Sequence, residues 1–525
     1  MYYRMAQPES LANLSLEALG KYACSLTCHL VVLPFKDIKY KKRKNRTTDF
    51  QILVKTCRKF HKMIVENIPV TLANEVTNKL LSYLDNMDTR FDTIQSITFS
   101  EYVFKEIAKS IVHPAVTRIE PEHGLLDCSD IFSHNSFKNT LLTHHLLKVI
   151  DSLTNLKVLN IRNSMERIDV SGIKFSPYLE EFCGECNDEG LEKLANSCKY
   201  LRSLDLCSLR DITNASIPTI LKMTHLQKLN IAHTSFTSDG ITVLLNALVE
   251  KGEASKLKCL VFSKYTPQHL RILENLPNLK VSLQHDYYTF FLTLDIFKMS
   301  DLYSLKNLHG LEITSSLRDL NDLLREIGHQ LVFLEVTIEI IDVDEQNNVT
   351  DASDMLLIGQ YCKKLRCLHI SGTVYGFPSM KNYTRRPLPG FQTITCLKLE
   401  VESGEKSVNT SPHKDLLYFL ISQCVNIKKL TVPVDVCFFG KYELMCSVIQ
   451  ADFMKNVEEV YFKLCCCECT FEDAGDMASD HDRDNEVVQM LIDHCPKLRV
   501  VGGVPGLNKR HHHNLQRLKF FTDLI

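Results

Sequence analysis

The most constraining feature of the sequence is a short apolar pattern, L-x-x-L-x-L, that recurs along most of the chain. Clear copies begin at Leu156, Leu201, Leu226, Leu308, Leu331, Leu365, Ile394, Ile427 and Val457, and weaker copies begin at Ile94, Val116, Leu179, Leu257, Leu279 and Leu498. The alternation of apolar residues within each copy predicts a short strand with one buried face. Successive copies lie mostly 22 to 34 residues apart, which leaves room for a helix between strands.

One strand and one helix cannot bury both of their apolar faces, whereas stacked copies can. The pattern resembles the leucine-rich repeat, which implies an α/β solenoid with parallel strands on a concave face and helices on a convex face. We expect this solenoid, with a C-terminal cap, over residues 91–525 and a small helical segment over residues 1–90. A chain of 525 residues exceeds what one compact core usually holds, unless the fold grows in one dimension.

Several of the expected helices end on a cysteine just before the next strand. Cys198, Cys362, Cys424 and Cys495 each precede an apolar position by three residues. A small apolar side chain fits a tight helix-to-strand junction, so we interpret these cysteines as packing residues. The chain has 20 cysteines spread over its length, which favours reduced thiols over disulfides.

Residues between the buried strand positions of a leucine-rich repeat face the concave groove. These residues are Val158, Asn160, Ser203, Asp205, Lys228, Asn230, Glu312, Phe333, Glu335, His369, Lys398, Glu400, Lys429, Thr431, Glu459 and Tyr461. Mixed charge with a few aromatic rings suits a protein ligand better than a phosphate polymer. The expected substrate-binding residues are Asn160, Asp205, Asn230, Glu312, Phe333, Glu335, His369, Lys398 and Tyr461, with Phe333 and Tyr461 as anchors. The alternative is that most of these positions are ordinary solvated strand faces.

The N-terminal segment has a different character. Leu11, Ser15 and Leu19 recur every four residues and share one helix face, which could enter an apolar pocket. A second amphipathic stretch begins at Ile68-Pro69 and continues through Leu72 to Leu84. The simplest interpretation is an N-terminal cap that shields the first repeat from water.

The segment from Ser10 to Leu19 also resembles a BC-box, which docks on elongin C, and Ile68-Pro69-Val70-Thr71-Leu72 resembles the cullin-selecting box that follows it. This order of boxes ahead of leucine-rich repeats resembles the Zyg-type substrate receptors of cullin-2 and elongin ubiquitin ligases. The resemblance implies a non-catalytic receptor that binds elongin B/C and cullin-2 through Leu11, Ser15, Leu19, Ile68, Pro69 and Leu72. Zyg-type receptors also carry an armadillo-like C-terminal region that captures glycine degrons, and this sequence shows only the repeat pattern to its end.

Two alternatives use the same residues. The stretch from Ile68 to Leu84 could begin an F-box that binds the adaptor Skp, although the chain enters the repeat pattern near Ile94. The protein could also be a scaffold for protein–protein interaction with no connection to a ligase.

Composition excludes several other classes. The net charge is −2, so no global charge favours nucleic acid or a membrane surface. The N-terminus has no apolar core of a signal peptide and no apolar run approaches a bilayer span, so we expect an intracellular, cytoplasmic protein. The basic run Lys39–Arg46 is interpreted as a solvated connection, with a nuclear-import signal or a nucleic-acid-binding patch as the alternatives.

Catalytic and metal-binding motifs are not evident. The sequence has no phosphate-binding loop of the Walker type, dinucleotide fingerprint, His-Glu-x-x-His motif or nucleophile elbow. The thiols of Cys183 and Cys186 lack a second pair, and alternate cysteines in Cys465–Cys469 would face opposite sides of a strand. We therefore expect no cofactor, no metal and no catalytic residue.

Overall fold

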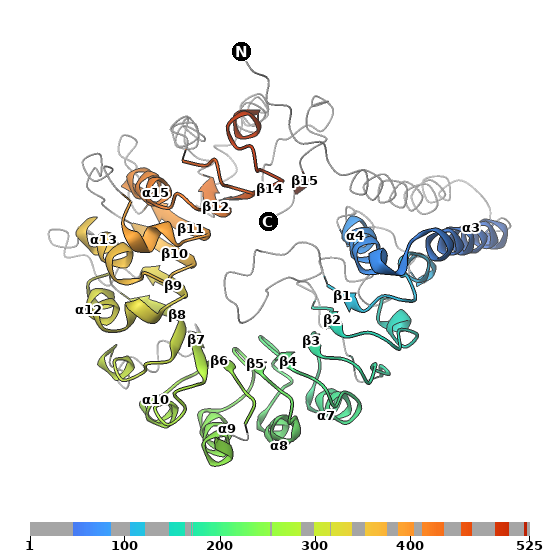
Figure 1. Cartoon of the computed structure of the whole chain (residues 1–525), viewed down its shortest axis with the longest axis horizontal. Helices are drawn as coiled ribbons and strands as arrows, with labels where there is room; N and C mark the ends of the chain where they lie inside the picture. The colour runs from blue at the N-terminus through green and yellow to red at the C-terminus, as the bar shows by residue number, and fades with distance from the viewer. Residues whose placement is uncertain are drawn as a thin grey trace. The chain divides into compact units, whose positions relative to one another are not determined.

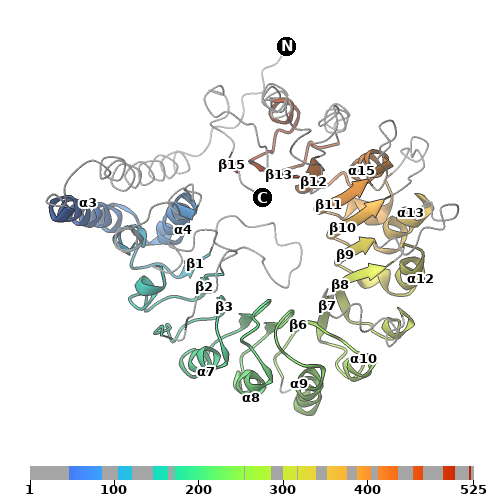
Figure 2. The same cartoon turned by 180° about the vertical axis from the view of Figure 1, so that it is seen from behind.

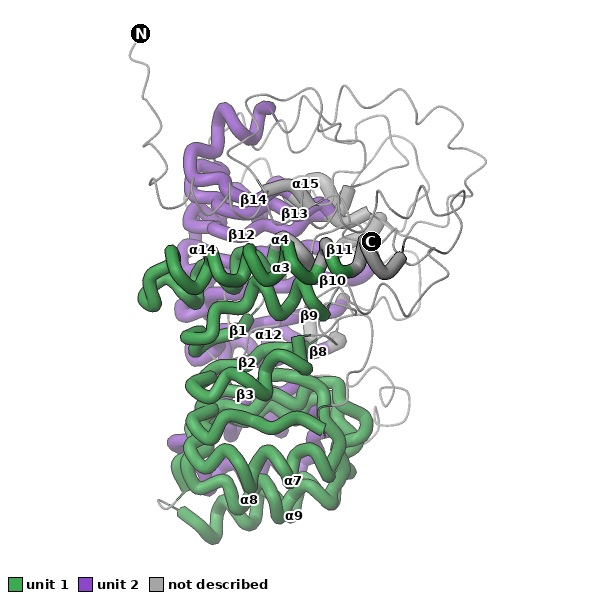
Figure 3. Tube along the Cα trace, turned by 90° about the vertical axis from the view of Figure 1, so that its right-hand side faces the viewer, with its two compact units in different colours: residues 1–124, 134–258 green, residues 125–133, 259–525 purple. Residues whose placement is uncertain are grey.

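The computed structural model describes residues 46–85, 105–120, 146–162, 170, 172–252, 255–284, 299–315, 317–338, 352–374, 387–403, 412–434, 453–464, 489–502 and 519–521. The chain divides into two compact units (Figure 3). Unit 1 comprises Met1–Gly124 and His134–Lys258, and unit 2 comprises Leu125–Ser133 and Cys259–Ile525. The predicted boundary between residues 90 and 91 lies outside the described residues and stays a prediction.

The described part of unit 1 begins with helices and continues as a parallel sheet. Its elements are α3 (Arg46–Asn67), η3 (Val70–Leu72), α4 (Ala73–Asp85), β1 (Arg118–Ile119), β2 (Val158–Asn160), β3 (Glu181–Cys183), α7 (Asp188–Ser197), β4 (Ser203–Asp205), η5 (Asn214–Ser216), α8 (Ile217–Lys222), β5 (Lys228–Asn230) and α9 (Ser238–Lys251). Strands β1 to β5 pair in chain order, and every pairing is parallel. Helices α7, α8 and α9 lie together on one side of this sheet (Figure 1).

Unit 2 follows the same plan with longer strands. Its elements are β6 (Cys259–Ser263), α10 (Pro267–Leu273), β7 (Lys280–Gln284), η7 (Met299–Leu302), β8 (Leu308–Ser315), α12 (Leu317–Ile327), η8 (Gly328–Gln330), β9 (Phe333–Ile338), α13 (Ala352–Tyr361), β10 (Cys367–Val374), α14 (Pro389–Gln392), β11 (Cys396–Ser403), α15 (Pro412–Gln423), β12 (Lys429–Val434), β13 (Glu459–Leu464), β14 (Val500–Gly502) and β15 (Lys519–Phe521). Strands β6 to β15 pair in chain order and in parallel. Helices α12, α13 and α15 lie on one side of their strands (Figures 1 and 2). We call the opposite side the helix-free face.

The apolar pattern of the sequence supplies the core of each sheet. In unit 2, Leu311, Leu334 and Leu368 lie opposite one another on β8, β9 and β10, and each is fully buried. The same row continues through Leu397, Leu430, Val460 and Val501. Leu159, Phe182, Leu204 and Leu229 form the matching row of unit 1. The strands predicted from the pattern are confirmed, except that the copy at Ile94 lies outside the described residues.

One weak copy has the wrong register. A copy beginning at Leu279 would bury Ser282 and Gln284, but β7 instead places Val281 and Leu283 opposite Leu260 and Phe262 of the core. Pairing to the preceding strand selects this register, because it puts two fully buried apolar side chains in the core row. Ser282 and Gln284 therefore belong to the helix-free face. The sequence analysis had predicted no groove residue on this strand.

The cysteines at the helix-to-strand junctions all form the same pair of backbone hydrogen bonds. Cys198, Cys362, Cys424 and Cys495 each donate a backbone hydrogen bond to the carbonyl four residues earlier and accept one from the residue three positions later. All four are buried, and the Sγ of Cys362 lies 3.1 Å from the position that a Cβ at Gly328 would occupy. Burial also raises the pKa of Cys198 to about 12 and that of Cys362 to about 12. These features support the interpretation of the cysteines as packing residues.

Replacing Cys362 by serine is expected to destabilise unit 2 by about 1–3 kcal/mol, because a hydroxyl replaces an apolar thiol at a fully buried site. Cys362→Ala is the matched control, since it removes the sulfur without adding a polar group, and we expect it to cost about 1 kcal/mol. The measurement is urea denaturation of both variants. A serine variant that is as stable as the wild type would contradict the packing interpretation.

Candidate functional site

The predicted adaptor-binding residues fall into two groups. Leu11, Ser15 and Leu19 lie outside the described residues, so their role stays a prediction. Ile68 and Leu72 are half-buried and Pro69 is exposed, in the turn between α3 and α4. Pro69 precedes η3 with φ −58°, and its carbonyl accepts a hydrogen bond from Leu72. The neighbouring Val70 is 69% exposed, which is unusual for a valine in a folded segment.

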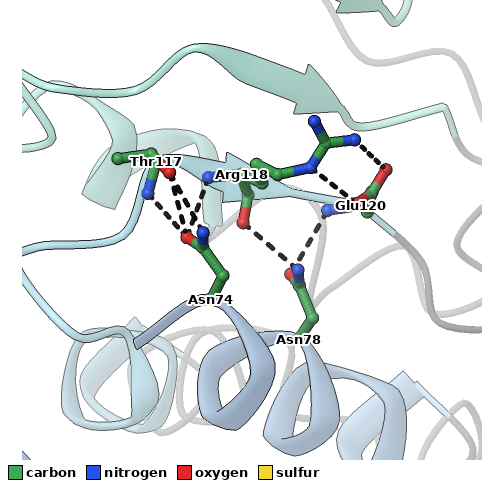
Figure 4. Close-up of polar contacts among 5 residues, drawn as sticks. All are labelled: Asn74, Asn78, Thr117, Arg118 and Glu120. Atoms are coloured by element: carbon green, nitrogen blue, oxygen red, sulfur yellow. Dashed lines mark hydrogen bonds and ion pairs between the residues drawn. The ribbon is translucent and has the colours of Figure 1, made fainter. Parts of the chain in front are cut away.

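Helix α4 is hydrogen-bonded to the first strand of unit 1 (Figure 4). The Asn74 Oδ1 accepts hydrogen bonds from the backbone N–H groups of Thr117, at 2.8 Å, and Arg118, at 3.1 Å. Asn78 accepts from the N–H of Glu120 and donates to the carbonyl of Arg118. Two side chains of α4 thus satisfy backbone groups of β1, whose described strand partner is β2. This arrangement is the one expected of an N-terminal cap.

In unit 1 the predicted groove residues bond to their own backbone. Asn160, Asp205 and Asn230 end their strands, are buried, and each accepts a hydrogen bond from the N–H two residues later. Asp205 also accepts from the Arg162 guanidinium at 2.8 Å. These side chains shape the turn that leaves each strand, and their role in substrate binding stays a prediction.

In unit 2 four neighbouring strands bring charged residues together on the helix-free face. Glu312, Glu335, His369 and Lys398 lie opposite one another on β8, β9, β10 and β11. Glu400 lies two residues beyond Lys398 on the same face. We call these five residues the charged cluster.

The imidazole of His369 is at the centre of the charged cluster. Its Nδ1 forms an ion pair with Glu335, and its Nε2 lies 3.3 Å from an Oε2 of Glu400. Lys398 Nζ lies 3.1 Å from the other oxygen of Glu400. His369 is 6% exposed, so both ring nitrogens are held by carboxylates in a largely dehydrated setting.

Burial and neighbouring charges shift the ionisation of the charged cluster. Burial, reinforced by the charge of Glu335, raises the pKa of Glu312 to about 8, although His369 and Lys398 act in the opposite direction. Burial alone would lower the pKa of His369, but its hydrogen bonds to Glu335 and Glu400 outweigh this and raise it. Burial, together with the charge of Glu312, raises the pKa of Tyr265, which keeps that phenol neutral.

A second group lies further along the same face, on β12 and β13. Lys429 is fully buried, with its Nζ 4.6 Å from the centroid of the Tyr461 ring and 3.9 Å from Glu459. The Tyr461 hydroxyl donates a hydrogen bond to Glu459 at 3.1 Å. Tyr461 is therefore engaged in a cation–π contact with a residue of its own chain. Phe333 on β9 is half-buried, and its role as an anchor stays a prediction.

Two groups of cysteines were considered as possible redox or metal sites, and the structure describes one of them. Cys183 and Cys186 are reduced thiols that form no disulfide with a described residue, and desolvation raises the pKa of Cys183 to about 12. Among the described residues, no group of three or more His, Cys, Asp or Glu side chains could hold a metal ion. Cys465–Cys469 lie outside the described part of the chain.

Sequence reasoning identified the members of the charged cluster as separate groove positions, and the structure shows that they interact. It missed Gln284 because of the register of β7, and Tyr265 because that residue follows β6 in a turn.

No family model matches the chain, and no curated protein is significantly similar to it. The described helices include none with the length and apolarity needed to cross a bilayer.

Proposed function

We propose that the chain is a leucine-rich-repeat solenoid that binds a partner protein along its helix-free strand face. The observation that carries this proposal is the charged cluster, which places five polar side chains from four adjacent strands on one surface beside Phe333. Parallel strands in chain order, with a recurring helix-to-strand junction, support the repeat assignment. Mixed charge and an aromatic ring are typical of a protein-binding surface.

The proposed activity is positioning, with no catalytic step by this chain. A nucleophilic cysteine needs a lowered pKa, and burial raises the pKa of the cysteines at the helix-to-strand junctions instead. The imidazole of His369 is held by carboxylates at both nitrogens, which leaves it no free nitrogen for proton transfer to a substrate.

We further propose that the N-terminal segment links the bound protein to a ubiquitin ligase through elongin and cullin-2. The resemblance of Ser10–Leu19 to a BC-box motivates this proposal. The exposure of Pro69 and Val70 supports it, because a cullin-selecting element must present its proline to a partner. A receptor of this kind raises the local concentration of its target near the charged ubiquitin carrier.

Replacing Leu11 by aspartate is expected to abolish capture of elongin C and cullin-2, because a charge would enter the apolar pocket that receives the helix. Tagged full-length chain is used to capture these proteins and Skp from cell lysate, with immunoblot detection. Asn13→Asp is the matched control, since it adds the same charge at a position that the BC-box leaves free.

Elongin C and cullin-2 bound by the wild type and by Asn13→Asp, but not by Leu11→Asp, would support the ligase proposal. Capture of Skp instead would move the adaptor site to the segment from Ile68 to Leu84. If no adaptor is bound, the N-terminal segment is a cap of the solenoid and the protein is a scaffold.

A further inference from the structure

Two polar side chains, Glu312 within the charged cluster and Gln284 beside it, have no described hydrogen-bond donor. Glu312 is 7% exposed, and no described residue donates a hydrogen bond to its carboxylate or forms an ion pair with it. Gln284 follows Leu283, which pairs with Leu311, so Gln284 and Glu312 are adjacent on the helix-free face. The Oε1 of Gln284 is buried and has no hydrogen-bond partner among the described residues. Buried acceptors without donors are costly, and a donor-rich ligand would remove that cost.

The charges around Glu312 favour a cationic ligand. Lys398 forms an ion pair with Glu400, and His369 forms ion pairs with Glu335 and Glu400. The cations of the charged cluster thus form their ion pairs with the other two carboxylates, and Glu312 forms no ion pair with a described residue, although the charges of His369 and Lys398 act to lower its pKa. A positively charged donor is therefore the complementary group.

The side chains beside Glu312 favour a planar cation. Phe333 lies two residues before Glu335 on the same face of β9, and it is half-buried. It pairs with Gly310, and the Ser282 side chain fills the space that a Cβ at Gly310 would occupy. A guanidinium group offers five donors in one plane and stacks on an aromatic ring, whereas an ammonium group is a compact and strongly hydrated charge.

We propose that Glu312, Gln284 and Phe333 form a subsite for an arginine side chain of the partner protein. This subsite rests on the proposed function, since it is one contact within the protein-binding face. Arginine residues are frequent at the energetic centres of protein interfaces, where they fill desolvated pockets.

Binding at this subsite is expected to depend on pH. The titratable groups that act on Glu312 are Glu335, His369, Lys398 and Tyr265. Because the pKa of Glu312 is raised to about 8, its carboxyl group is protonated at neutral pH until a guanidinium group binds and favours the ionised form. Binding therefore releases a proton and tightens as pH rises from about 6.5 to about 8.5, where arginine remains charged. Loss of the proton on His369 removes a positive charge near Glu312, so it also tightens binding of the cationic ligand as pH rises.

The test is a selection of peptides from a random displayed library on the immobilised full-length chain. Peptides that bind the wild type are expected to be enriched in arginine, and those selected on Glu312→Gln are not. Synthetic versions of one selected peptide carry arginine, citrulline or lysine at the enriched position. We expect the citrulline peptide, which keeps the shape and loses the charge, to bind about tenfold or more weakly.

The outcomes separate this inference from the proposed function. If the wild type selects no peptide, the proposal of a protein-binding face fails, and the arginine subsite fails with it. If peptides are selected without arginine, or if Glu312→Gln selects the same arginine peptides, only the subsite is overturned. Equal binding of the lysine and arginine peptides would overturn the choice of a guanidinium group.

Discussion

Replacing Glu312 by glutamine is expected to make the chain more stable than the wild type above pH 8. The pKa of Glu312 is raised from 4.5 to about 8 in the folded chain, so folding favours its protonated form. The stabilisation from the protonated form is fully present below pH 4.5 and is lost as pH rises through about 8. Glutamine has the shape of the protonated carboxyl and does not ionise. We expect the difference in unfolding free energy to reach about 5 kcal/mol at high pH and to vanish at low pH.

Urea denaturation at a series of pH values between about 4.5 and 9 measures this difference. The matched control is Glu326→Gln, because Glu326 is an exposed glutamate on α12. We expect the control to follow the wild type at every pH. Parallel curves for Glu312→Gln and the wild type would mean that Glu312 is ionised in the folded chain at neutral pH.

Replacing Asn74 by alanine is expected to detach α4 from β1 and to destabilise unit 1 by about 2–3 kcal/mol. The change removes the acceptor of two backbone N–H groups, those of Thr117 and Arg118, and the donor to the Thr117 hydroxyl. The described strand partner of β1 is β2, so no neighbouring strand of the described residues replaces these bonds. Hydrogen exchange at residues 117 and 118 should accelerate.

The design compares three asparagines of the N-terminal helices. Asn78→Ala should have a smaller effect, because its hydrogen bonds to Arg118 and Glu120 are longer, at 3.2 and 3.3 Å. Asn67→Ala is the control, since Asn67 is exposed and bonds only within its own helix, to the carbonyl of Met63. Unchanged exchange at residues 117 and 118 in Asn74→Ala would show that α4 does not hold the first strand.

The strands could be predicted well because each one carries its own apolar alternation. The pattern at Leu331 and Leu365 required no knowledge of neighbouring strands, and β9 and β10 begin within two residues of the apolar position that opens each copy. The junction cysteines were predictable for the same reason, since Cys362 and its neighbours repeat a local spacing. Where the alternation is ambiguous, as between Leu279 and Gln284, the choice of register came from pairing to β6.

The charged cluster was only partly predictable. Glu312, Glu335, His369 and Lys398 were identified as groove positions, since each occupies the same place in its copy of the pattern. The ion pairs of His369 with Glu335 and Glu400 could not be predicted, because they depend on side-chain positions across three strands.

In most of the described strands, β7 excepted, the sequence by itself determined which residues are buried and which lie between them. That information is local, because a strand with one buried face repeats every two residues whatever its neighbours are. Only the tertiary structure decided which polar side chains meet, which of them already have partners, and that Glu312 has no hydrogen bond or ion pair with a described residue. The physical reason is that charge pairing and desolvation act over a few ångströms in space, between residues that are 20 or more positions apart in the chain.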